Sequence, residues 1–522
     1  MMRRSVAYSR AYSLLAGPLL AMTVLAVGGS CAPVCRGVDG ACLDLRVEGA
    51  GSYTSYEIEW RYSISEEPLA ALRRGATEQG GELPRTFRVL PPPGVAADSV
   101  RSVGVLGLSD DGSEQASGSI ETSLGGDEHS TQVMPLGLRV NRRDVTLTTS
   151  SADLIAVDLN EDSVIDLAVV GTPKSATASS TTGGVLSVLY GVGDGTYRAP
   201  QIFDIPTHAM SVKAIDVNND TRRDLLTSGS GDSLSLFMNG ASGQFTNRTQ
   251  IVNSTGLMSG ECQSGSDTHS VAVGDFNGDG LVDVAASLRS RPCVSLLLGT
   301  SSTAFVAKDS APRPTPLAVG DSLTRMAVAD FNSDGRADVA VIRTTEGIGN
   351  VSILLGGDKE SGFTLSSIFT AGNEPTGILT DDFNGDQKPD LAVVSARSSS
   401  LQVFLNKGFV QGMFGGSTGT VSDRPADYEY RFGLPGYGPT CIASGDVNGD
   451  GIVDVAVCDT TLPTIAVMIG RRDGSFDPPI RLAVDREPRS IVIADLDGKG
   501  QRDLAVVHSG SPKLTVLLNR TN

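Results

Sequence analysis

Seven short acidic segments recur along this chain, and their residue types are those that bind a hard cation. Each segment has Asp at positions 1 and 9, and six of the seven also have Asn at position 3 and Asp at position 5. In the copy DFNGDGLVDVA these four residues are Asp275, Asn277, Asp279 and Asp283. Side-chain oxygens that alternate along a tight loop suit calcium, which takes about six to eight oxygen ligands. The spacing therefore predicts one calcium loop in each copy.

The predicted metal ligands are the residues at positions 1, 3, 5 and 9 of the six regular copies. They are Asp158, Asn160, Asp162, Asp166, Asp216, Asn218, Asp220, Asp224, Asp275, Asn277, Asp279, Asp283, Asp330, Asn332, Asp334, Asp338, Asp382, Asn384, Asp386, Asp390, Asp446, Asn448, Asp450 and Asp454. Asp and Asn could instead serve only as turn residues, and seven copies in one register argue against that alternative. An EF-hand is disfavoured because position 12 is not Glu and a strand follows the loop.

Two copies depart from the pattern. In the last copy Lys499 occupies position 5, where its ammonium group would compete with a cation. We therefore predict a weak or empty metal loop at Asp495, Asp497 and Asp503. The second copy has Thr221 and Arg222 where Gly and a small side chain would turn more easily, so we rank it below the others.

The spacing of the copies indicates the elements that carry them. The copies begin 49–64 residues apart, a period typical of propellers and solenoids. Each repeat reads as a strand, the acidic loop, two further strands and an aromatic residue that begins a fourth strand. These aromatic residues are Tyr197, Phe245, Phe305, Phe363, Phe414 and Phe476. Position 2 of the loop is always apolar and is predicted to pack inward. The pattern predicts an all-β, seven-bladed propeller, in which a strand near 142–149 completes the last blade and closes the ring.

In these residues the repeats resemble the FG-GAP or VCBS family, whose blades form the propellers of integrin α-subunits. The acidic loop and the Gly turn followed by an aromatic residue occur in the family's order across residues ~139–522. The resemblance implies seven blades, calcium in the loop between the first two strands of a blade, and partners that often bind the opposite face. It implies binding or display and does not imply one ligand.

The N-terminal segment predicts export. Three arginines precede an apolar stretch over residues 14–27, which is typical of a signal peptide and too short to span a bilayer comfortably. The sequence GGSC follows, and it resembles the lipobox of bacterial lipoproteins, although Gly28 stands where that family usually has Leu. We predict a signal peptide over 1–30 and lipidation of Cys31, with ordinary secretory cleavage as the alternative. Short alternating strands over 31–137 predict a small β-sandwich-like domain before the propeller at 138–522.

Cysteine parity agrees with an oxidising compartment. Lipidation of Cys31 would leave six cysteines for disulfides, with free buried thiols as the alternative. The pairs that lie close in sequence are Cys35 with Cys42, Cys262 with Cys293, and Cys441 with Cys458.

The net charge and the catalytic motifs bear on which classes of function are expected. The net charge of −18 argues against a nucleic-acid partner, because phosphate binding needs a basic face. Ser417 in GGSTG fits G-x-S-x-G but lacks the strand-to-helix context of a nucleophile elbow. The four histidines are scattered along the sequence, so each is expected in a loop or on the surface. We expect no catalysis, and a secreted polysaccharide- or ester-acting hydrolase or lyase on the same propeller remains the alternative.

The longest insertion, residues 406–440, suggests a binding surface. It is rich in aromatic residues and runs to the face opposite the acidic loops. Tyr428, Tyr430 and Tyr437 are candidates for contact with a glycan or protein partner, and a self-packed loop is the alternative. The sequence therefore predicts an exported, lipid-anchored calcium-binding propeller that touches the membrane only through its N-terminal lipid.

Overall fold

The computed structural model describes most of the repeat region. The described ranges are 138–173, 183–205, 208–229, 233–251, 268–288, 294–300, 305–307, 322–345, 348–358, 362–410, 413–414, 426–431 and 438–521. In the N-terminal part it describes seven strands and nothing between them.

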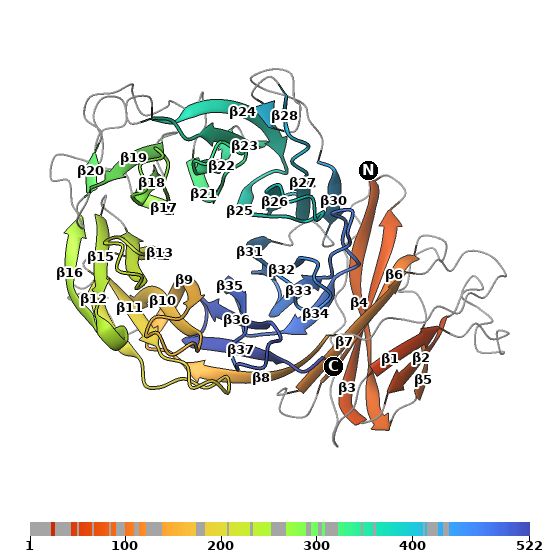
Figure 1. The fold of residues 1–522 in the computed structure, drawn as a ribbon. Helices are drawn as coiled ribbons and strands as arrows, with labels where there is room; N and C mark the ends of the chain where they lie inside the picture. The colour runs from red at the N-terminus through yellow and green to blue at the C-terminus, as the bar shows by residue number, and fades with distance from the viewer. Residues whose placement is uncertain are drawn as a thin grey trace. The chain divides into compact units, whose positions relative to one another are not determined.

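The repeat region forms seven four-stranded antiparallel blades arranged in a ring (Figure 1). Blade one consists of β9 (Thr149–Val157), β10 (Asp166–Pro173), β11 (Gly184–Leu189) and β12 (Gln201–Ile205). Blade two consists of β13 (Ala209–Ile215), β14 (Asp224–Gly229), β15 (Ser233–Asn239) and β16 (Phe245–Ile251). Blade three consists of β17 (Thr268–Gly274), β18 (Asp283–Leu288), β19 (Val294–Gly299) and β20 (Phe305–Ala307). Blade four consists of β21 (Ser322–Ala329), β22 (Asp338–Thr345), β23 (Ile348–Leu355) and β24 (Thr364–Ala371).

The remaining blades contain the two exceptions to simple chain order. Blade five consists of β25 (Pro375–Asp381), β26 (Asp390–Ser395), β27 (Ser400–Phe404) and β30 (Tyr428–Arg431). Between its third and fourth strands lies a hairpin of β28 (Phe409–Val410) and β29 (Met413–Phe414). Blade six consists of β31 (Pro439–Gly445), β32 (Asp454–Asp459), β33 (Thr464–Met468) and β34 (Ile480–Ala483). Blade seven consists of β35 (Pro488–Ala494), β36 (Asp503–His508), β37 (Lys513–Asn519) and β8 (Arg139–Thr146).

Blade seven is therefore built from both ends of the repeat region. Lys513 Nζ and Thr515 Oγ1 on β37 donate to Asp144 on β8, at 3.1 and 3.3 Å. The predicted all-β, seven-bladed propeller is confirmed. Among the described residues, helix is limited to the short 3-10 turn η3 (Ala241–Gly243), and no helix is long and apolar enough to cross a membrane.

The chain divides into two compact units, and the second, Arg143–Asp477 with Val484–Asn519, contains the propeller except for β34 and the first residues of β8, which are counted with the first unit. In its N-terminal part the first unit contains two groups of strands. One is a sheet of β1 (Met22–Ala26), β2 (Leu43–Gly49) and β5 (Arg85–Val89). The other has the order β7 (Glu114–Glu121), β6 (Val100–Leu108), β3 (Ser52–Ile64) and β4 (Glu67–Glu82). The signal peptide and the β-sandwich-like domain remain predictions.

Apolar side chains between successive blades form the core. The aromatic residue after the third strand of one blade packs against the position-2 residue of the preceding blade. The ring centroids of Phe363 and Phe276 lie 5.1 Å apart, and those of Phe476 and Phe383 lie 5.7 Å apart. The rings of Phe414 and Phe331 lie 5.7 Å apart, and the corresponding residues elsewhere share one core cluster: Tyr197 and Leu496, Phe245 and Leu159, and Phe305 and Val217. The position-2 residue packs inward as predicted, and it joins neighbouring blades.

Blade five differs from the sequence prediction at Phe414. This residue is fully buried and stacks on Phe369 of blade four, yet it lies in the β28–β29 hairpin and not in the fourth strand of blade five. The fourth strand is β30, which pairs with β27 from Tyr428 to Arg431. The hairpin carries the expected aromatic residue to its position between blades, and the edge strand comes from later in the chain.

A β-bulge occurs at the same place in the first strand of every blade. In each case the pairing between the first and second strands skips one residue. The skipped residues are Ala152, Met210, His269, Thr324, Thr376, Thr440 and Arg489. Bulges bend a strand locally and re-aim side chains. Thr376 and Thr440 donate to the carbonyls of Pro439 and Pro488 in the next blade, at 2.6 and 3.3 Å.

Candidate metal loops

Each acidic segment connects the first and second strands of one blade, and its carboxylates hold the turn. In blade six, Asp446 Oδ1 accepts the backbone N–H groups of Gly449 and Asp450 at 2.7 and 3.1 Å. Its Oδ2 accepts the N–H of Gly451 at 2.8 Å. Asp450 Oδ1 accepts the N–H of Ile452 at 2.8 Å. The acidic residues thus satisfy the backbone donors of the loop that they belong to.

The loop backbone passes twice through the left-handed region. Positions 4 and 6 have positive φ in all seven copies. Glycine provides this conformation most easily, as at Gly451 with φ 79°. Three copies adopt it at position 6 without glycine, at Ser163, Thr221 and Gln387. All seven loops therefore share one backbone conformation, and that conformation does not require glycine at position 6.

The aspartate at position 9 has a second function that the sequence pattern did not indicate. It is fully buried in every blade. In blade six, Asp454 Oδ2 accepts the N–H of Val447 at 2.7 Å and Oδ1 accepts the N–H of Gly470 at 2.8 Å. The same two bonds occur around the ring, with a Gly or Asn at or just after the end of the third strand as the second donor. One carboxylate therefore joins the loop to the end of the third strand.

Burial perturbs the acidity of these groups. Loss of hydration raises the pKa of Asp454 to about 6, although the N–H groups of Gly470 and Val447 favour its charged form. Burial raises the pKa to about 6 for Asp166, Asp283, Asp338, Asp390 and Asp503, and it also raises the pKa of Asp224. Neighbouring loop carboxylates act in the same direction at several of these sites, as Asp279 and Asp275 do on Asp283. A nearby cation would oppose both effects.

The residue types at positions 1, 3, 5 and 9 are those that a hard cation such as calcium takes as ligands. All four residues supply carboxylate or amide oxygen in the six regular loops. In four loops the Asn amide at position 3 donates its N–H to the aspartate at position 5, at distances from 2.9 to 3.1 Å. This N–H partly offsets the negative charge of that aspartate, and a cation would do the same more strongly once the amide turned its oxygen inward.

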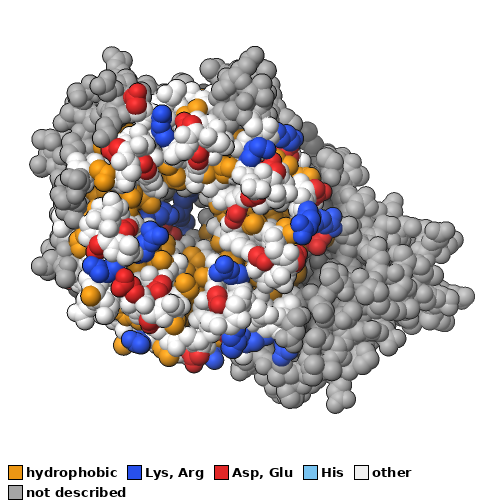
Figure 2. Space-filling view, viewed as in Figure 1, with side chains coloured by type: hydrophobic (Ala, Val, Ile, Leu, Met, Phe, Trp, Pro, Cys, Tyr) orange, Lys and Arg blue, Asp and Glu red, His pale blue; other side chains and the backbone are white. Residues whose placement is uncertain are grey.

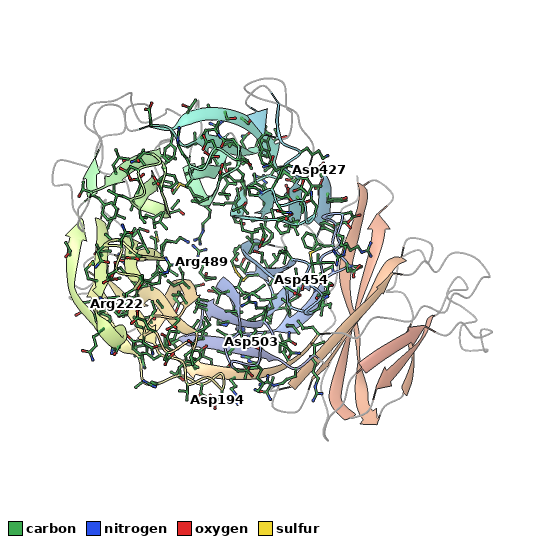
Figure 3. All side chains as sticks on the ribbon, in the orientation of Figure 1. Asp194, Arg222, Asp427, Asp454, Arg489 and Asp503 are labelled. Carbon is green, nitrogen blue, oxygen red and sulfur yellow. A yellow bond between two sulfur atoms is a disulfide. The ribbon has the colours of Figure 1, made fainter. Side chains whose placement is uncertain are left out.

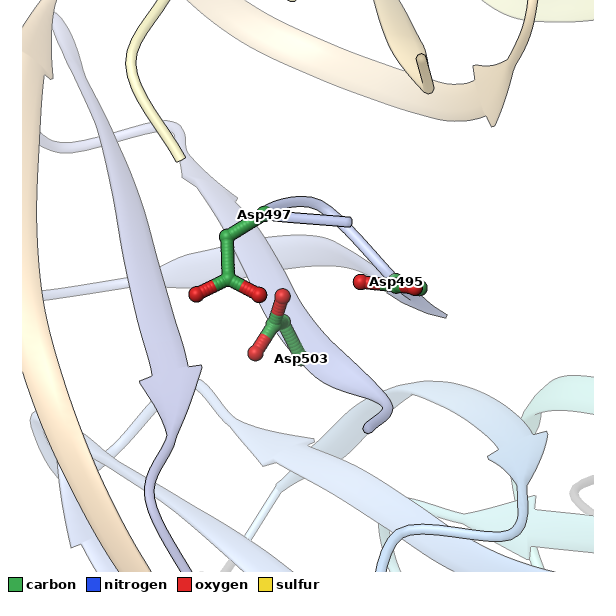
Figure 4. Close-up of side chains that lie close together, drawn as sticks. All are labelled: Asp495, Asp497 and Asp503. Atoms are coloured by element: carbon green, nitrogen blue, oxygen red, sulfur yellow. The ribbon is translucent and has the colours of Figure 1, made fainter. Parts of the chain in front are cut away.

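Three loops carry a basic side chain that pairs with their own aspartates. Arg222 lies 2.7 Å from Asp220 in the second loop, and Lys388 lies 2.8 Å from Asp386 in the fifth. In the seventh loop Lys499 Nζ lies 2.6 Å from Asp497 Oδ2. Asp495, Asp497 and Asp503 converge, with oxygens within 4.8 Å of one another (Figure 4), and among the described residues no other group of three Asp, Glu, His or Cys side chains does so. The lysine stands where it was expected to compete with a cation, and the predicted weakness of this site remains a prediction.

The candidate partner-binding tyrosines have internal contacts. Tyr428 and Tyr430 lie in β30 and pack against the core between blades five and six. The Tyr430 hydroxyl accepts the N–H of Phe476 at 2.6 Å, and the Tyr428 hydroxyl donates to the carbonyl of Asp473 at 3.1 Å. This placement favours the alternative in which these residues pack within the chain. Tyr437 and Ser417 lie outside the described residues.

One predicted disulfide is present. Cys441 and Cys458 face each other across β31 and β32 and are bonded, with Cα atoms 5.1 Å apart. Cys31, Cys35, Cys42, Cys262 and Cys293 lie outside the described residues. His508 departs from the expectation of a loop or surface position, because it is fully buried in β36 with Nε2 3.1 Å from Thr515 Oγ1.

Comparison with known proteins agrees with the repeat pattern. Residues 216–286, 330–393, 382–457 and 446–506 match the FG-GAP-like repeat family. Two similar solved structures are crystal structures of BBS1N in complex with ARL6DN. The one soaked with lead is 9% identical, covers 72% of this chain and 94% of that chain, and has a TM-score of 0.46. The one soaked with mercury is 11% identical, covers 73% of this chain and 97% of that chain, and has a TM-score of 0.47. No curated protein matches the chain.

Proposed function

We propose that this propeller of FG-GAP-like repeats is a non-catalytic, calcium-stabilised binding or scaffold module. The fold itself suggests such a module, because a propeller presents many loops on a rigid ring. The observation that carries the proposal is the repeated use of the position-9 aspartate. Both of its oxygens accept backbone N–H groups in each blade, so it serves the architecture.

The same observation weighs against the hydrolase or lyase alternative. A pKa near 6 would suit a general acid, but a catalytic carboxyl group must also be free to exchange a proton with a substrate. Asp454 is fully buried and already accepts hydrogen bonds at both oxygens. Seven equivalent aspartates around a ring are better explained by seven equivalent turns than by one active site.

Calcium fits the regular loops through the side chains already described. In the third loop Asp275, Asn277, Asp279 and Asp283 would hold it, with the carbonyl of Leu281 available at position 7. When bound, calcium supplies positive charge that offsets the repulsion among these carboxylates. Asp275 and Asp279 contribute by ordering the loop around that charge, since both already accept backbone N–H groups of the loop.

Export and a lipid anchor belong to the proposal on the strength of the N-terminal residues alone. The apolar segment and Cys31 would place the propeller outside the cytoplasm, attached by lipid to a bacterial membrane or cell surface. The alternative is secretion without an anchor. The proposed partner is a protein or glycan on the face opposite the calcium loops, and nucleic acid is not expected.

Calcium dependence can be tested on the purified protein by thermal unfolding. Chelation should lower the melting temperature, and added calcium should restore it, because a ligand that binds only the folded state stabilises it by about 2.7 kcal/mol at a hundred times its Kd. Asp275→Asn with Asp279→Asn should reduce the calcium-dependent part of the shift. Unchanged melting in chelator and calcium would remove calcium from the proposal.

The choice between binding and catalysis needs a separate measurement. The same preparation would be screened against polysaccharides and esters for turnover, and against glycan and protein arrays for binding. Binding without turnover supports the module. Release of reducing ends, unsaturated sugars or acid in proportion to the protein concentration would instead establish the enzyme alternative.

A further inference from the structure

The acidic loops, numbered here by their blades, are not equivalent in charge. In loops two, five and seven a basic side chain of the loop itself pairs with one of the loop's own aspartates, and we call these three the paired loops. Figure 2 shows Lys and Arg atoms beside several Asp and Glu groups on the face that it presents, and Figure 3 labels Arg222 of loop two and Asp503 of loop seven. Each paired loop therefore already contains a positive charge beside a proposed calcium ligand.

In loops two and five the basic residue stands at position 7 and engages both oxygens of the aspartate at position 5. Asp386 Oδ1 accepts the backbone N–H of Lys388 at 3.0 Å, and Asp386 Oδ2 accepts from Lys388 Nζ at 2.8 Å. Asp220 Oδ1 accepts the backbone N–H of Arg222 at 2.9 Å, and Asp220 Oδ2 accepts from Arg222 Nη2 at 2.7 Å. Calcium would have to displace the basic side chain to bind this second oxygen.

Loop seven reaches the same result with a lysine at position 5. Lys499 Nζ lies 2.6 Å from Asp497 Oδ2, and the Asp497 side chain is only 1% exposed. The ammonium group offsets part of the repulsion among the converging carboxylates of Asp495, Asp497 and Asp503. Their convergence therefore does not require a metal ion.

Loop four shows that a basic residue at position 7 need not pair with its own loop. Arg336 stands at the same position as Lys388, and no ion pair joins it to Asp334 in the described part of the chain. Its side chain extends towards blade three, where a Cβ added at Gly278 would lie 3.4 Å from Arg336 Nε. Arg336 and Lys388 thus place the same charge at the same position, without and with the pairing.

The blades of the paired loops also differ in the residue that donates to the position-9 aspartate from the end of the third strand. This donor is Asn239, Asn406 or Asn519 in the blades of the paired loops and Gly in the other four. A Cβ added at any of those glycines would lie 2.1–2.5 Å from the carbonyl oxygen of position 8. In blades two and seven that carbonyl instead accepts from the asparagine Nδ2, at 3.0 and 3.1 Å. The division among the loops is therefore present in the backbone as well as in the charges.

We propose that Arg222, Lys388 and Lys499 are built-in counter-ions, so that calcium fills loops two, five and seven only at concentrations well above those that fill the other loops. This inference rests on the proposed calcium binding. A displaced side chain stays tethered beside its aspartate, and tethering gives it a high effective concentration with which calcium must compete. The seven loops are thereby divided into two classes of calcium affinity.

The test counts the calcium ions that the full-length protein binds. Equilibrium dialysis against buffered free calcium, followed by elemental analysis, gives the number of ions in each phase of binding. The wild type should bind no more than four ions in the tighter phase, because three of the seven loops are paired. Any further ions should need roughly tenfold more calcium or above.

Variants assign the phases to loops. Lys388→Leu should add one ion to the tighter phase, because it removes the counter-ion from loop five and leaves the proposed ligands in place. Leu suits position 7, which is Val164, Leu281 or Ile452 in three other loops. Arg336→Leu is the matched control, since it removes the same charge from the same position of loop four, and it should leave the number unchanged. Lys499→Asp restores the regular position-5 residue in loop seven and should also add one ion.

The outcomes separate this inference from the calcium proposal. Seven ions in a single phase of the wild type, or no added ion in Lys388→Leu, would overturn the inference and leave calcium binding intact. An added ion in Arg336→Leu would also overturn it, because net charge and not pairing would then decide occupancy. A wild type that binds no calcium would overturn both. If Lys499→Asp does not fold, Lys388→Leu and its control still decide, because Lys388 is an exposed side chain.

Discussion

At the scale of single residues, the position-9 aspartate shows how one side chain can serve two purposes. Its oxygens accept backbone N–H groups that join the loop to the third strand, and it is also a proposed calcium ligand. The first purpose should be independent of calcium, and the second should matter only when calcium is bound. The aspartates at positions 1 and 5 order the loop itself. Blade six offers a direct comparison, because Asp454 is buried and Asp450 is exposed.

We expect Asp454→Asn to destabilise the protein by about 1–3 kcal/mol, because the amide leaves a buried N–H group facing another donor. The loss should already be present in chelator, and it should be larger in calcium because Asp454 is also a proposed calcium ligand. Asp450→Asn should change stability by less than about 0.5 kcal/mol in chelator and should cost more in calcium. Urea unfolding under both conditions measures these differences. Equal stability of the two variants in chelator would contradict a metal-independent role for the buried carboxylate of Asp454.

Asp153 predicts a pH dependence of stability. Its pKa is lower in the folded protein than its ordinary value of 3.8, so its charged form stabilises the fold above that pH. This contribution is lost as the pH falls from 3.8 through the lowered folded-state value. The destabilisation caused by Asp153→Asn should therefore be largest near neutral pH and should shrink in strong acid, as followed by urea unfolding across pH. A deficit that grows on acidification would contradict the assignment.

At the scale of elements, the loop and its two flanking strands could be predicted from the sequence, and the partners of the loop could not. Regular spacing of Asp and Asn indicated where the first strand ends and the second begins. The N–H of Gly470 that meets Asp454 comes from the end of the third strand, 16 residues later, and carries no pattern that marks it as a partner.

The sequence did not predict the β-bulges, because the residue that the strand pairing skips differs in type from blade to blade. Blade five was misread because its hairpin supplies the aromatic residue that the pattern assigns to a fourth strand.

The disulfide of blade six gives a prediction at this scale. Cys441 and Cys458 join the first two strands across a sequence separation of 17 residues. Closing a loop of this length removes unfolded-state entropy worth about 3 kcal/mol. Cys441→Ser with Cys458→Ser should lower the free energy of unfolding by about that amount. Reduction of the disulfide in the wild-type protein should lower it equally. Stability that does not change on reduction or substitution would contradict a stabilising bond.

At the scale of the whole molecule, the ring is completed by β8 beside β37, which lie at opposite ends of the repeat region. The repeat count and the incomplete final repeat were enough to expect seven blades and a returning strand. Side-chain contacts across this closure were not predictable, because Asp144 and Lys513 are 369 residues apart.

A charge exchange tests the closure. Asp144→Lys should place like charges beside Lys513 and weaken the β8–β37 pairing, with a cost of about 0.5–1 kcal/mol because both side chains are partly exposed. Asp144→Lys with Lys513→Asp should recover part of the loss. Hydrogen exchange of the β37 amides measures the local effect. Exchange that is unchanged in the single variant would show that this pair does not contribute to closure.

The arrangement of blade seven also sets the order of events during biosynthesis. Blades one to six can each assemble as their own strands leave the ribosome, but blade seven must wait for β37, which ends at Asn519. Until then the edge of β8 has no partner from the ring, and the nascent propeller is an open arc. The ring therefore cannot close before β37 has been synthesised, and a chain cut short anywhere in the repeats would expose strand edges to other chains.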